Sequence, residues 1–123
     1  MNAMNLAQRA YAPTTAPTKS NRSMEYDVIA KITYRLKKAI DVDDLGPLLE
    51  ALHENRKLWR ILAMNVADSG NLLPEDLRSR IYYLSEFTNH HTSQVIRRVA
   101  SPVPLVEVNT AILRGLRSEG QAT

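Results

Sequence analysis

The chain has 123 residues, of which 44% are hydrophobic and four are Gly, and this predicts one folded domain with a single core. Because it has no Cys, no apolar run of about 18 residues and no charged-then-apolar start, we expect no disulfide, thiolate site, membrane-spanning helix or secretory signal, as in a cytoplasmic protein. Sixteen basic residues alternate with thirteen acidic ones for a net charge of +3, and no Lys/Arg run exceeds two residues, which argues against a nucleic-acid-binding face.

Residues 1–19 are expected to form a flexible N-terminal arm. Pro13 and Pro17 disfavour regular structure there, although residues 4–11 are compatible with a short helix. The remaining pattern is helical almost throughout. The chain is thereby divided into the arm (1–19), a single helical domain (20–118) and a disordered tail (119–123).

The helical domain opens with two long amphipathic segments. The first is expected over about residues 20–40, with Ser20 or Asn21 as the N-cap residue. The second is expected to begin within residues 43–47, where a Pro in the first turn is tolerated, and to end near Asp68.

Two further helices follow after clear break signals. Gly70 is expected to adopt the left-handed conformation that closes the second helix. The third helix should begin at Pro74 and end before Pro102, and the fourth should cover about residues 105–116. Four amphipathic helices with short links predict an all-α fold, a small helical bundle of four main helices with an extended N-terminal arm.

Polar side chains interrupt the apolar stripes of these helices. Arg56, with Asn55 beside it, falls on the stripe of the second helix, and Thr88, His91 and Asn109 fall on later stripes. An unpaired neutral group would cost about 1–3 kcal/mol if buried, and a charge would cost more. Either these groups satisfy one another inside the bundle, for example with Asn109 accepting from Arg56, or a partner helix supplies the missing acceptors.

No residue pattern predicts catalysis or a resident ligand. His90 and His91 are adjacent and point about 100° apart on a helix, so they cannot chelate one metal ion. Glu86 and His90 share a helix face, which is more typical of a surface contact, and His91 is expected to be a hydrogen-bonded core residue. We therefore expect a non-enzyme without metal or cofactor.

The second helix is apolar on nearly every side over residues 58–64. Leu58, Ile61 and Met64 lie outside the stripe that contains Trp59. Either the other helices and the arm wrap around this helix, or it presents an apolar patch. Three aromatic side chains also point away from the main stripes, as exposed interface residues would: Tyr34, Tyr82 and Tyr83.

Several short motifs, taken in order, resemble the flagellar biosynthesis regulator FlaF family. They are Ala10-Tyr11, "NRKLW" (55–59), "NLLPEDLR" (71–78) and "VNTAILRGL" (108–116). The resemblance extends from Tyr11 to Leu116. The chain departs from the family's usual pattern before the first helix and at "NTAI" (109–112), where Asn-Arg-Glu-Ile is common.

The resemblance implies a protein that binds flagellin in the cytoplasm as a secretion chaperone and supports flagellin synthesis and export alongside the regulator FlbT. An apolar groove on a helical protein could hold an amphipathic terminal helix of flagellin. In that case Trp59 would be the apolar anchor, and Asn55 and Arg56 would either lock the bundle or form the floor of the groove. The candidate partner-binding residues are Asn55, Arg56, Leu58, Trp59, Ile61, Leu62, Met64, Tyr82 and Tyr83.

Two alternatives remain open at this stage. One is an RNA-binding post-transcriptional regulator of flagellin mRNA, although no aromatic residue is interleaved with a basic run. The other is an adaptor that docks FlbT. We expect a monomer or a weak dimer.

Overall fold

A computed structural model describes the backbone of residues 21–122 and the side chains of residues 25–117, and it confirms the all-α fold. The described residues form no strand and contain helices α2 (Asn21–Val42), α3 (Leu45–Ala67), α4 (Glu75–Ile96) and α5 (Val103–Ala122). The predicted arm at 1–19, with its short helix at 4–11, lies outside the described residues. Helix α5 continues to Ala122, so helix covers residues 119–122 of the expected tail.

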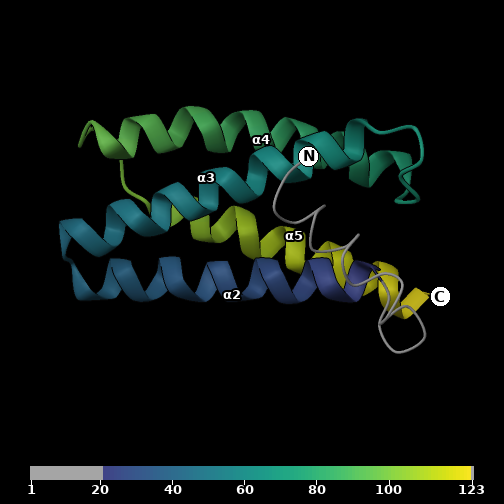
Figure 1. Ribbon diagram of the computed structural model, residues 1–123, viewed down its shortest axis with the longest axis horizontal. Coiled ribbons are helices and arrows are strands. Elements are labelled where there is room, and N and C mark those ends of the chain that lie inside the picture. The colour runs from purple at the N-terminus through teal and green to yellow at the C-terminus, as the bar shows by residue number, and fades with distance from the viewer. Residues whose placement is uncertain (1–20, 123) are drawn as a thin grey trace.

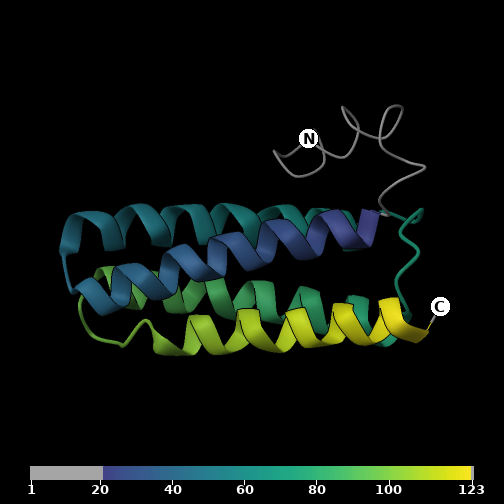
Figure 2. The same cartoon turned by 90° about the horizontal axis from the view of Figure 1, so that it is seen from below.

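The four helices run alternately up and down the long axis of the molecule (Figures 1 and 2). Helix α3 packs against α2 and α4, and α5 packs against the same two helices. The pairs α2/α4 and α3/α5 therefore lie diagonally across the bundle. The predicted four-helix bundle is confirmed, and its connections place sequence neighbours side by side.

Side chains, rather than a left-handed Gly, close α3. The backbone leaves the helix at Asp68, with φ −73° and ψ 129°. Gly70 N donates to Asp68 Oδ1 at 3.0 Å, and Asn71 Nδ2 donates to the Asn65 carbonyl at 3.1 Å. No described Gly has a positive φ, so the prediction for Gly70 was wrong: an Asx turn supplies the reversal instead.

Two charged residues occupy the left-handed positions that Gly often takes after a helix. Asp43 has φ 57° after α2, and its N–H donates to the Ala39 carbonyl. Arg98 has φ 66° after α4, which ends at Ile96, well before Pro102. The N–H groups of Arg98 and the following residue donate back into the last turn of α4, the bonding of a Schellman motif.

The interior contains two hydrophobic clusters separated by a polar layer. The larger cluster lies toward the end where α2 begins, and its buried members are Ile29, Leu58, Trp59, Ile61, Leu62, Val66, Leu73, Leu77, Ile81, Ile112 and Leu116. The smaller cluster lies toward the other end, and its buried members are Leu36, Ala39, Ala51, Leu52, Val95 and Leu105. Every helix has at least one buried polar residue between the two sets: Thr33 on α2, Asn55 on α3, Ser85, Thr88 and Thr92 on α4, and Asn109 on α5.

Asn109 is the centre of the polar layer. Its Oδ1 accepts from Trp59 Nε1 at 2.7 Å, and its Nδ2 donates to Thr33 Oγ1 at 3.0 Å and to Asn55 Oδ1 at 2.8 Å. The Thr33 hydroxyl donates in turn to the Ile29 carbonyl at 2.7 Å. This network joins α2, α3 and α5 at the middle of the bundle.

Candidate functional site

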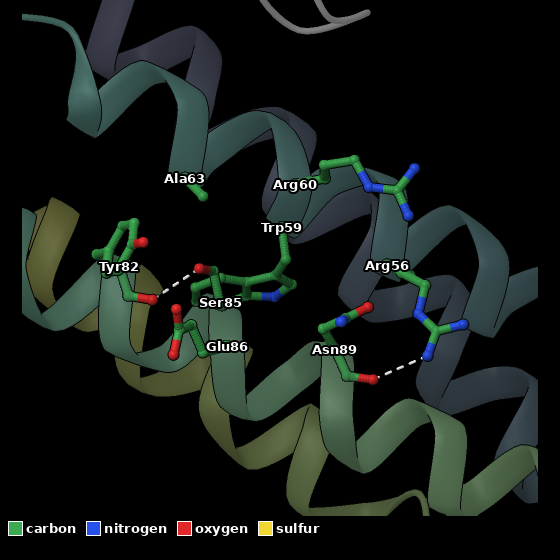
Figure 3. Close-up of a pocket in the computed structure, with 8 residues that line it drawn as sticks. All are labelled: Arg56, Trp59, Arg60, Ala63, Tyr82, Ser85, Glu86 and Asn89. Atoms are coloured by element: carbon green, nitrogen blue, oxygen red, sulfur yellow. Dashed lines mark hydrogen bonds between the residues drawn. The ribbon is translucent and has the colours of Figure 1, made fainter.

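A groove lies between α3 and α4 and encloses about 300 Å³ (Figure 3). Helix α3 contributes Arg56, Trp59, Arg60 and Ala63, and helix α4 contributes Tyr82, Ser85, Glu86 and Asn89. On each helix these residues are spaced at i, i+3, i+4 and i+7. The groove therefore follows two helical turns, a length of about 10 Å.

Small side chains create the hollow. Ala63 and Ser85 stand where larger residues would fill the space between the helices, and the Ser85 hydroxyl donates to the Tyr82 carbonyl at 2.7 Å (Figure 3). The Trp59 ring lies between the two helices and is only 1% exposed, with its N–H directed to Asn109. The groove thus has an aromatic floor and a polar rim.

Arg56 ties α3 to α4 at one end of the groove. Its Nη2 donates to the Asn89 carbonyl at 2.8 Å and also to the Ser93 hydroxyl. The expectation that Asn109 accepts from Arg56 was wrong. Asn55 and Arg56 point about 100° apart on the helix, so the amide reaches the interior while the guanidinium reaches α4.

The rim carries both signs of charge. Arg60 is exposed and has no hydrogen bond or ion pair within the described part of the chain. Figure 3 shows its guanidinium pointing away from Trp59, on the same side of α3 as Arg56. On α4, Glu86 and Tyr82 line the groove toward the end away from Arg56. An apolar floor between charged edges suits an amphipathic protein segment.

Of the nine predicted partner-binding residues, the groove brings together Arg56, Trp59 and Tyr82. Four others are buried in the bundle and do not line the groove: Asn55, Leu58, Ile61 and Leu62. Met64 and Tyr83 are 51% and 72% exposed but do not line the groove.

A continuous apolar patch over residues 58–64, one of the two alternatives for this stretch, is therefore not present as a surface. Leu58 and Ile61 are 2% and 4% exposed, because α3 is flanked by both α2 and α4 and its wide apolar face is covered from two sides. Only Met64 stays open. Of the two readings of this stretch, a wrapped helix describes the structure.

Sequence reasoning missed five groove residues, namely Arg60, Ala63, Ser85, Glu86 and Asn89. A usable signal was that, at the i, i+3, i+4 and i+7 positions of both helices, one aromatic residue is accompanied by three small or polar residues. A groove, unlike a core, is bordered by such residues on two facing helices.

The His residues have structural surroundings. His91 Nε2 lies 2.7 Å from the Ser101 carbonyl, and its ring stacks on Phe87 with centroids 5.2 Å apart. The side chain is half-buried, so His91 is hydrogen-bonded as predicted but lies at the edge of the core. No group of three His, Asp or Glu side chains in the described residues could hold a metal ion.

The fold and the groove define a small antiparallel four-helix protein with a groove between two of its helices. The family model described as "Flagellar protein FlaF" matches residues 7–116, and the chain belongs to this family. The resemblance found in the sequence motifs is thereby confirmed, and the chain is a flagellar protein. No curated protein and no solved structure matches it. Within the described residues, no helix has the length and apolar character needed to cross a membrane.

Proposed function

We propose that this protein is a cytoplasmic chaperone that binds an amphipathic terminal helix of flagellin in the α3–α4 groove and so supports flagellin synthesis and export. The groove itself carries the proposal. It follows two turns of antiparallel helices, and its floor is the ring of Trp59. A helix docked there would present apolar residues to the indole and polar residues to the rim.

The residue types along the groove favour a protein partner. Trp, Tyr and Arg are the side chains that most often dominate interface energy, and the groove contains Trp59, Tyr82 and Arg60. Because Arg60 has no partner within the described residues, a carboxylate of the bound helix can pair with it without breaking a contact. We expect the bound segment to carry an acidic residue beside its apolar stripe.

Binding of a flagellin terminal-helix peptide tests this proposal. Trp59 is the only Trp of the chain, so its fluorescence reports occupancy of the groove directly. Tyr82→Ala should lower the affinity for the peptide at least about tenfold, as expected for a residue that anchors an interface. Tyr82 is 52% exposed, so the Tm should barely change.

The adjacent tyrosine provides a matched control. Tyr83 is 72% exposed and points about 100° away on the helix, so Tyr83→Ala should change the affinity less than about twofold. Ala63→Leu should fill the groove and abolish the fluorescence response. Equal effects of the two tyrosine variants, or binding of flagellin leader RNA without binding of the peptide, would contradict the proposal.

A further inference from the structure

One end of the bundle is unusually apolar. The α2–α3 and α4–α5 turns lie together there, as both views show (Figures 1 and 2). This end, called here the turn end, holds six of the eleven exposed large hydrophobic side chains of the described residues. They are between 40% and 67% exposed: Val42, Leu45, Leu49, Ile96, Val99 and Val103.

The two turns carry opposite charges. Asp41, Asp43 and Asp44 lie at the α2–α3 turn, and Arg97 and Arg98 lie at the α4–α5 turn. All five are exposed, and none has an ion pair within the described part of the chain. The turn end is therefore an apolar surface with one acidic and one basic edge.

The backbone of both turns adds an independent observation. Asp43 and Arg98 adopt left-handed conformations, with φ 57° and 66°. Gly takes such positions without strain, and a long side chain such as Arg does so rarely. Strained residues of this kind concentrate where the side chain is needed for function. A charged side chain therefore stands at each of two positions that Gly adopts with less strain.

We propose that a second copy of this chain docks on the turn end, giving an end-to-end two-fold dimer. A two-fold interface requires a self-complementary surface. When two turn ends face each other across a two-fold axis that lies in the contact plane, each acidic turn can oppose the basic turn of the other copy. The apolar side chains then meet in the middle.

The area available at the turn end predicts a weak dimer. With helices about 10 Å apart, the end of the bundle offers about 400 Å² per copy, or about 800 Å² in total. Stable interfaces bury about 1,200–2,000 Å². The dimer should therefore be reversible, with a Kd on the order of 10–100 µM. The α3–α4 groove faces sideways along the bundle, so dimerisation leaves both grooves open.

Sedimentation equilibrium with charge reversals tests the dimer. Asp41→Lys/Asp43→Lys and Arg97→Glu/Arg98→Glu should each weaken self-association at least about tenfold, because like charges then face each other. An equimolar mixture of the two variants should associate again, since opposite charges are restored across the interface. Wild-type protein that stays monomeric to about 1 mM, or a mixture that does not associate, would overturn the proposal.

The Arg98→Gly variant distinguishes an effect on dimerisation from an effect on the stability of the fold. The substitution removes the backbone strain of the left-handed conformation, so the Tm of the monomeric protein, measured at low concentration, should rise by a few degrees. It also removes the charge of Arg98, so dimerisation should weaken. Val99→Ser should also weaken the dimer. Leu72→Ser is the matched control, because Leu72 is 88% exposed at the opposite end of the bundle. A stabilised Arg98→Gly protein with unchanged association, or an equal effect of Leu72→Ser, would overturn the proposal.

Discussion

Asn109 uses both ends of its amide inside the bundle. Its oxygen accepts from the Trp59 indole, and its nitrogen donates to Thr33 and Asn55. A single residue of α5 thereby fixes the rotamers of residues on α2 and α3. Buried polar groups that satisfy one another in this way select one alignment of the helices, because a slip along any helix would leave several of them unpaired.

Two threonines of the polar layer should respond oppositely to the same isosteric change. Thr33→Val removes a hydroxyl that both donates and accepts, and it should lower the free energy of unfolding by about 1–2 kcal/mol. The Thr88 hydroxyl is buried without a hydrogen-bond partner among the described residues, so Thr88→Val should be neutral or stabilising by up to about 1 kcal/mol. Urea unfolding of both variants measures this, and changes of the same sign would contradict the assignment.

At the scale of elements, the sequence predicted where helices lie better than how they end. Pro47 and Pro74 mark the starts of α3 and α4 because Pro is tolerated only near a helix start, and both helices begin within a few residues of the expected positions. The ends were harder to predict. Gly70 is the residue with the highest intrinsic preference for a left-handed cap, yet Asp43 and Arg98 adopt that conformation. Intrinsic preference does not specify which residue the hydrogen bonds at a helix end place in the left-handed conformation.

Gly115 lies on α5 where that helix packs against Leu77 of α4. A Cβ at this position would lie 3.4 Å from Leu77 Cδ1, which is an ordinary van der Waals distance. Gly115→Ala should therefore stabilise the protein by about 0.5–1 kcal/mol, through helix propensity and a new contact. Thermal unfolding measures the change.

Gly46→Ala is the comparison for this prediction. Nothing lies within 4 Å of a Cβ at Gly46, so that variant gains helix propensity alone. A destabilised Gly115→Ala protein beside a stabilised Gly46→Ala protein would show that the spacing between α4 and α5 cannot accept a methyl group.

At the scale of the whole molecule, the site depends on which helix covers which face. The pattern of α3 singled out Arg56 and Trp59, which line the groove, and the pattern of α4 predicted that Tyr82 is exposed. The pattern of α3 could not show that Leu58 and Ile61 are covered, because one helix's periodicity does not specify its neighbours. The hollow above Trp59 depends on small residues of two helices that come together only in the bundle.

Helix α4 packs extensively on α3 but takes no part in the hydrogen-bond network around Asn109. Its three buried hydroxyls make no hydrogen bond to another helix: Thr88 has no partner among the described residues, and Ser85 and Thr92 donate to carbonyls of α4 itself. It also packs less extensively on α5 than α2 does. Its polar ties to α3 include the bonds that Arg56 donates to Asn89 and Ser93.

Native-state hydrogen exchange should therefore show α4 opening with a lower free energy than the central turns of α2, α3 and α5. Arg56→Met keeps the apolar stem but removes the donors, and should lower the protection of α4 by a further factor of about five, or about 1 kcal/mol, with little change in α2 or α5. Arg60→Met is the control, because Arg60 lies one turn further along α3 and has no partner within the described residues. If all four helices exchanged only through one global unfolding step, or if both substitutions affected α4 equally, the hydrogen bonds of Arg56 would not help to hold α4 on α3.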